Sequence, residues 1–124
     1  MEITPHIPQD RQVIESYGEG RFRISGEPYG SSVLVFPERT LAWTVTDMSD
    51  LSLDALPGVL EAEPAIEILI VGCGERLVPL PGHLREPLRE KGIGVDTMDT
   101  GAACRTFNIL LAESRRVAAA LIAL

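Results

Sequence analysis

The clearest hydrophobic pattern covers residues 66–74, where the almost unbroken apolar run Ile-Glu-Ile-Leu-Ile-Val ends in a Gly-Cys-Gly turn. Such a run is typical of a strand that is buried on both faces of a sheet. Glycines just past the strand let the backbone bend sharply and approach whatever lies beyond the sheet edge. The pattern therefore predicts a central strand, and we expect a functional site at the edge where it ends.

Shorter elements are predicted before this run. Alternating or β-branched residues indicate three strands, which we expect to form an antiparallel meander, at residues 21–24, 32–36 and 40–46. Leucine and valine then recur at helical spacing, which predicts a helix over residues 51–62 with Asp47 and Ser49 as candidate N-caps. Pro57 interrupts this helical pattern.

After the central strand, the pattern predicts a helix and a further strand. Pro81 suits the first turn of a helix and Gly92 suits its C-terminal cap, so we expect a helix over about 81–91. A short strand follows at residues 93–98, and a last helix after it. The order strand, helix, strand, helix implies a parallel strand pair, and the first half adds antiparallel strands. The fold class is therefore α/β, with a mixed sheet and helices on its faces.

The last helix is predicted to run from about 100 to 122, with Asp99 or Thr100 as its cap. Its apolar stripe has a period of 3.6 residues and consists of Ala103, Phe107, Leu110, Leu111, Val117, Ala118 and Leu121. The opposite face is partly apolar as well, through Ile109, Ala112, Ala119 and Ala120. This second surface leaves a homo-oligomer open as an alternative.

Length, charge and composition limit the class of protein. The 124 residues suit a single domain, 1–124, in which about 1–13 form a loosely ordered N-terminal segment. The formal net charge of −7 argues against nucleic acid, because phosphate contacts need a basic face. The first residues lack a signal-peptide pattern, and the apolar run over 117–124 is far shorter than the ~20 residues that span a bilayer. We therefore expect a cytoplasmic protein without direct membrane insertion.

Two cysteines, Cys73 and Cys104, are the first candidates for chemistry. The carboxyl ends of parallel strands share one sheet edge, and the last helix begins at that edge. A thiol in the first turn of a helix has its pKa lowered by the dipole, and Arg105 adds positive potential. Either a thiol is reactive here, or both are small buried hydrophobic residues, as cysteines often are.

Polar residues extend the same edge. Glu75, Arg76, Asp96 and Asp99 could form a rim with acid–base or simply solubilising roles. Asn108 lies off the apolar stripe of the last helix, and we expect it to tie that helix to a neighbouring loop.

A salt bridge is also predicted on the last helix. Glu113 and Arg116 are three residues apart, which suits an ion pair across one helical turn. Tyr29, in a Pro-Gly loop, is the aromatic residue that we expect to be exposed.

Cofactor and metal motifs are absent from the sequence. A dinucleotide-binding turn needs a third glycine where Leu77 stands, and prolines follow instead of a helix. The histidines, His6 and His83, do not combine with the cysteines at zinc-site spacing. We expect neither a cofactor nor a metal.

Three segments stand out together: the strand end Ile70-Val71-Gly72-Cys73-Gly74, the short strand Val95-Asp96-Thr97-Met98-Asp99-Thr100, and the helix positions Ala103, Arg105, Thr106, Phe107, Asn108, Leu110, Glu113, Arg116, Val117 and Ala118. They resemble a known family, the domain shared by mitochondrial complex I assembly factor 3 and its small bacterial relatives. The similarity runs from about Ile14 to the end of the chain. Two residues depart from the family pattern: Ser114 replaces a common glycine, which preserves a small side chain, and Cys73 replaces small residues such as threonine.

The resemblance implies a three-layer α/β fold with a mixed five-stranded sheet and no established catalytic activity. Its best-described member assists the assembly of a membrane-bound respiratory complex. The first hypothesis is thus a non-enzymatic accessory or assembly factor that contacts a protein partner. The alternative is a small-molecule-binding or thiol-dependent enzyme. Both use the same edge, formed by Gly72, Cys73, Gly74, Glu75, Arg76, Asp99, Cys104, Arg105 and Asn108.

Overall fold

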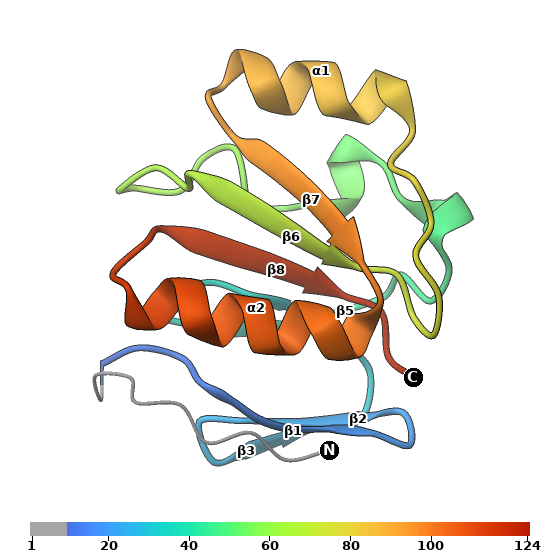
Figure 1. Ribbon diagram of the computed structural model, residues 1–124, viewed down its shortest axis with the longest axis vertical. Helices are drawn as coiled ribbons and strands as arrows, with labels where there is room; N and C mark the ends of the chain where they lie inside the picture. Colours follow the sequence, from blue (N-terminus) through green and yellow to red (C-terminus); the bar gives the residue numbers. More distant parts are fainter. Residues whose placement is uncertain (1–9) are drawn as a thin grey trace.

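The computed structural model describes residues 10–124, and within them the strands form a three-stranded antiparallel sheet and a five-stranded mixed sheet (Figure 1). The elements are the strands β1 (Ile14–Gly18), β2 (Arg21–Ile24), β3 (Glu27–Tyr29), β4 (Ser32–Val35), β5 (Thr40–Trp43), β6 (Ile68–Gly72), β7 (Gly94–Met98) and β8 (Val117–Leu121), the helices α1 (Gly82–Glu90) and α2 (Thr100–Ala112), and the short 3-10 helices η1 (Met48–Asp50) and η2 (Leu53–Ala55). The larger sheet has the order β5-β4-β8-β6-β7. The predicted α/β class and mixed five-stranded sheet are confirmed.

The middle strand of the larger sheet is β8, and β6 beside it is also an interior strand, as its apolar run predicts. Strand β6 pairs in parallel with β7 on one side and with β8 on the other. Its side chains alternate between two cores: Leu69 and Val71 pack with Leu84 of α1, whereas Ile70 packs with Phe107 of α2. Because both faces are covered, neither face of β6 needs polar residues.

The predicted helix over 100–122 is wrong in its second half. α2 ends at Ala112, Ser114 adopts a left-handed conformation with φ 63°, and residues 117–121 form β8 between β4 and β6. Ala119 and Ala120 are fully buried on opposite faces of the sheet, so they do not belong to an exposed helix face. In residues 117–121, strand pairing and burial favour the strand by more than the intrinsic helix preference of alanine. That preference is worth at most ~0.7 kcal/mol per residue relative to other ordinary residues.

The predicted meander in the first half is also wrong. Residues 21–24 pair with β1 and β3 in the smaller sheet, whereas β4 and β5 form a hairpin at the edge of the larger one. β1 was not predicted, because its residues have little periodicity. The turn to β2 is tight, with Gly18, Glu19 and Gly20 all at positive φ. The smaller sheet lies beside α2 in Figure 1, and β1 contacts that helix.

The predicted helix over 51–62 is wrong: the 3-10 helix η1 ends at Asp50, before this range, and the short 3-10 helix η2 is the helical turn within it. Pro57 and the positive φ of Gly58 follow η2, and both oppose continuation as an α-helix. Leu56 and Val59 of this segment still pack into the core on the α1 side of the sheet.

The other predicted elements of the second half are confirmed. α1 (Gly82–Glu90), β7 (Gly94–Met98) and the start of α2 lie where the pattern places them. Asp99 is the N-cap of α2, since its Oδ1 accepts a 2.9 Å hydrogen bond from the N–H of Ala102.

Candidate functional site

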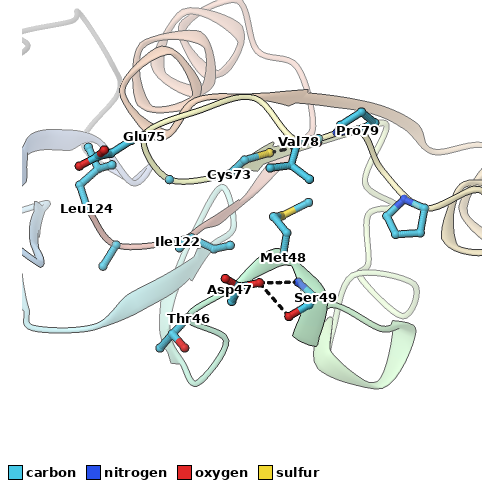
Figure 2. Close-up of a pocket in the computed structure, with 13 residues that line it drawn as sticks. Thr46, Asp47, Met48, Ser49, Cys73, Glu75, Val78, Pro79, Ile122 and Leu124 are labelled. Atoms are coloured by element: carbon cyan, nitrogen blue, oxygen red, sulfur yellow. Dashed lines mark hydrogen bonds between the residues drawn. The ribbon is translucent and has the colours of Figure 1, made fainter.

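An open groove of about 530 Å³ lies beside the turn that follows β6 (Figure 2). One wall is the chain from Cys73 to Pro81, and η1 faces it. The lining residues are Thr46, Asp47, Met48, Ser49, Cys73, Gly74, Glu75, Val78, Pro79, Pro81, Ile122, Ala123 and Leu124. The edge predicted from the Gly-Cys-Gly turn thus coincides with a cavity.

The fully buried Thr100 holds the turn in place. Its Oγ1 accepts a 2.9 Å hydrogen bond from the N–H of Gly74 and donates a 2.7 Å hydrogen bond to the carbonyl of Ile122. The N–H of Thr100 also donates to the carbonyl of Gly74 at 2.8 Å. One residue at the start of α2 therefore fixes two of the chain segments that line the groove.

The glycines on either side of Cys73 have different roles. A Cβ at Gly72 would lie 3.0 Å from both Thr100 Oγ1 and Leu121 Cδ2, so a larger residue would push these neighbours away by a few tenths of an ångström. Gly74 has a φ of +97°, which L side chains rarely adopt. The first glycine permits close packing, and the second lets the chain turn away from the sheet.

Cys73 lies at the bottom of the groove and is almost completely buried. Its Sγ donates to the carbonyl of Val78 at 3.4 Å, a contact drawn in Figure 2. The side chain of Met48 reaches into the same space from η1. The floor of the groove is therefore apolar and polarisable, and a largely buried thiol forms part of it.

Cys104 lies on the other side of the sheet. It is fully buried in the core that contains Phe107 of α2 and Ile14 of β1, away from the core of Cys73. Burial raises the pKa of its thiol from 9.0 to about 12, although Arg105 acts in the opposite direction. The expected lowering of this pKa is wrong, because desolvation outweighs the helix dipole and the neighbouring charge.

The remaining predicted site residues are divided among several places. Of the predicted set, Cys73, Gly74 and Glu75 line the groove, whereas Arg76 is exposed and does not line it. Asp99 caps α2, and Nη1 of Arg105 donates a 2.9 Å hydrogen bond to the hydroxyl of Tyr17.

Asn108 ties α2 to another element, as predicted, although its partner is a strand and not a loop. Its Oδ1 accepts from the N–H of Ile14 at 3.0 Å, and its Nδ2 donates to the carbonyl of Ile14 at 2.9 Å. The expected pair of Glu113 with Arg116 is wrong, because α2 ends before Arg116. That guanidinium instead lies 2.6 Å from Glu38.

Several groove residues were missed from the sequence: Met48, Val78, Pro79, Ile122 and Leu124. For Asp47 and Ser49 the sequence predicts only a capping role, which Asp47 does fill at η1. Two consecutive apolar residues, Leu77 and Val78, in a proline-rich loop are the signal that points to this surface, since loops are normally polar.

Within residues 10–124, no group of three or more His, Cys, Asp or Glu side chains is arranged to hold a metal ion. His83 is exposed, and His6 lies outside the described residues. Among the helices of that same part of the chain, none has the length and apolar content needed to cross a membrane.

The fold and the groove define a small α/β protein with a mixed sheet and an apolar recess at the end of the buried strand β6. The chain belongs to the family described as "Protein of unknown function (DUF498/DUF598)", whose profile matches residues 14–122. The family expected from the three resembling segments is thereby confirmed.

Curated relatives include "NADH dehydrogenase [ubiquinone] 1 alpha subcomplex assembly factor 3" of Danio rerio, 41% identical over 89% of this chain and 63% of the relative. The protein of that name in Xenopus tropicalis is 39% identical, over 88% of this chain and 60% of its own length. The chain thus spans less than two thirds of these relatives. An uncharacterized protein of Rhodobacter capsulatus is 37% identical, over 88% and 82% of the two chains.

Solved structures share the fold. A structure described as an outer membrane protein from Bartonella henselae matches with a TM-score of 0.85 and 42% identity, over 95% of this chain and 98% of that chain. A protein from Rhodopseudomonas palustris matches with a TM-score of 0.80 and 41% identity, over 99% and 90%.

Proposed function

We propose that this chain is a non-enzymatic assembly factor that binds a partner protein through the groove and the loop from Glu75 to Pro79. The observation that carries the proposal is the exposure of two consecutive apolar side chains beside the groove. Leu77 is 60% exposed and Val78 is 38% exposed. Large apolar side chains that gather next to a recess are typical of a protein interface.

The distribution of such residues supports this location. Within residues 10–124, the exposed large hydrophobic residues are Leu77, Val78 and Ile109. Ile109 stands alone on α2, where a single exposed apolar residue is ordinary. Only Leu77 and Val78 adjoin each other and an apolar cavity.

The relatives support the class of function. Those from Danio rerio and Xenopus tropicalis are named as assembly factors of NADH dehydrogenase, and they share with this chain the domain that contains the groove. Because the chain covers 60–63% of their length, the proposal concerns the work of that shared domain. We propose that its partner is a subunit or another assembly factor of a respiratory NADH dehydrogenase.

Site-specific photo-crosslinking tests the proposal. The photoreactive residue p-benzoylphenylalanine is placed at Leu77, or at Ile109 as a matched control of similar exposure on a distant element. In cells that make the chain, we expect a discrete adduct from position 77 and none from position 109. Mass spectrometry should identify the captured protein as a component of NADH dehydrogenase assembly. Equal adducts at both positions, or none at 77, would contradict the proposal.

A further inference from the structure

The charges around the groove all have one sign. Among its lining residues within the described chain, the charged ones are Asp47 and Glu75. Arg76 follows Glu75 in sequence but does not line the cavity. The whole chain carries a formal net charge of −7, so its long-range field has the same sign as the groove.

The two carboxylates lie on different walls of the groove. Asp47 precedes η1, and its Oδ1 accepts hydrogen bonds from the N–H and the hydroxyl of Ser49 at 2.9 and 2.8 Å. Glu75 comes from the loop after β6, across the groove from η1 (Figure 2). Met48, Val78 and Ile122 contribute apolar side chains to the same groove, and Figure 2 shows the Glu75 carboxylate beside Leu124, at the end of the groove away from Met48 and Val78. The site is thus an apolar recess with an acidic rim.

The backbone of the groove wall formed by residues 73–81 limits how a partner can be recognised. Pro79 and Pro81 have no N–H groups, so this wall offers few donors to an added β-strand. Recognition by side chains is favoured instead: an apolar group for the recess and positive charges for the rim.

We propose that the groove binds a basic, amphipathic segment of a partner protein. An apolar side chain of that segment packs against Met48 and Val78, and flanking Lys or Arg side chains pair with Asp47 and Glu75. The inference rests on the proposed function and adds the chemistry of the partner. A second copy of this chain fits poorly, because its charge has the same sign.

Three short synthetic peptides test the inference by two-dimensional NMR titration of the full chain. The first has a Leu-Leu pair flanked by lysines, the second replaces the lysines with glutamates, and the third replaces the leucines with serines. We expect the first peptide to bind most tightly and to shift the amide signals of Cys73, Glu75 and Val78. Both other peptides should bind at least about threefold more weakly.

Variants locate the binding. Asp47→Asn combined with Glu75→Gln should weaken the lysine–leucine peptide by about threefold to tenfold, because two exposed ion pairs are lost. Asn keeps the capping oxygen at position 47. Glu27→Gln combined with Glu90→Gln is the control: both acids are exposed outside the groove, and the net charge changes equally. This control pair should leave affinity within about twofold.

The outcomes separate the inference from the proposed function. Equal affinity for the lysine and glutamate peptides, equal weakening by both double variants, or no binding of any peptide overturns the basic-segment inference. An NADH dehydrogenase component captured from position 77 would still support the assembly function in that case. Conversely, selective peptide binding without a captured component would support the groove chemistry and contradict the assembly function.

Discussion

Asn108 of α2 binds both backbone polar groups of Ile14 in β1, at 3.0 and 2.9 Å, and this pair of hydrogen bonds joins residues that are 94 positions apart. The side chain is almost completely buried. It gives the start of β1 the same two hydrogen bonds that a neighbouring strand would give. The smaller sheet is therefore attached to α2 by a polar contact as well as by apolar packing.

Asn108→Ala should destabilise the protein by about 2–4 kcal/mol, because it leaves a buried N–H and a buried C=O of Ile14 without their partner. Urea unfolding followed by circular dichroism measures the change. Ile109→Ala, at the exposed neighbouring position, is the control and should change stability by no more than ~0.5 kcal/mol. A loss below ~1 kcal/mol for Asn108→Ala would show that water or a shifted strand replaces the contact.

Gly72→Ala should destabilise the protein by ~1–3 kcal/mol, because the added methyl group lies 3.0 Å from Thr100 Oγ1, which is held by its own hydrogen bonds. Thermal unfolding measures this, with Gly30→Ala as the control, since a Cβ there meets nothing within 4 Å. The displaced Thr100 should also alter the amide signals of Gly74 and Ile122. If both variants unfold alike, the close packing of α2 on β6 does not depend on glycine.

Ser114→Gly should stabilise the protein by ~0.5–1 kcal/mol, because Ser114 has a φ of 63°, where glycine avoids the cost paid by a Cβ. A glycine at this position, as the family resemblance implies, would suit the left-handed backbone conformation and not only the need for a small side chain. Glu113→Gly, one residue earlier at φ −88°, should instead destabilise by a similar amount. Chemical denaturation of the two variants gives opposite signs if the left-handed turn is the cause.

Cys104 should resist alkylation in the native protein and react only on unfolding, because it is fully buried on the far side of the sheet. Cys73, at the groove, should react sooner. Iodoacetamide labelling followed by mass spectrometry gives the two rates, and Cys73→Ser and Cys104→Ser assign them. Faster labelling of Cys104 than of Cys73 would contradict this order.

The pKa of Cys104 also predicts a dependence of stability on pH. The thiol ionises at about 9.0 in the unfolded chain but at about 12 in the folded protein, so the folded state keeps its proton longer. Below pH 9 the thiol is protonated in both the folded and the unfolded chain, and ionisation takes no stability away. As the pH rises from 9 toward 12, the thiol ionises in the unfolded chain alone, so the free energy of unfolding falls. Cys104→Ala should make the alkaline loss of stability less steep, which urea unfolding at several pH values measures. An unchanged slope would mean that other groups govern this region.

Much of the second half followed from the sequence because its signals are local. The run that forms β6, the proline and glycine that bound α1, and the cap at Asp99 each act within a few residues, and each element lies where predicted. The need of a buried asparagine for partners likewise led to the contact of Asn108, although its partner is distant in sequence. The edge at the Gly-Cys-Gly turn was located from the same local pattern.

Other features were decided only by tertiary structure. The Val-Ala-Ala-Ala-Leu sequence of β8 has the propensity of a helix, and becomes a strand because β4 and β6 pair with it on both sides. Strand β2 pairs with β1, and η1 faces Cys73 across the groove. In both cases the local sequence pattern of one segment carries no information about the other. The sequence by itself thus determined the buried strand β6 and the turn beside it, because short-range apolar patterning and backbone constraints encode them. Only the folded chain decided what faces that turn, because burial and strand pairing are energies shared between distant segments.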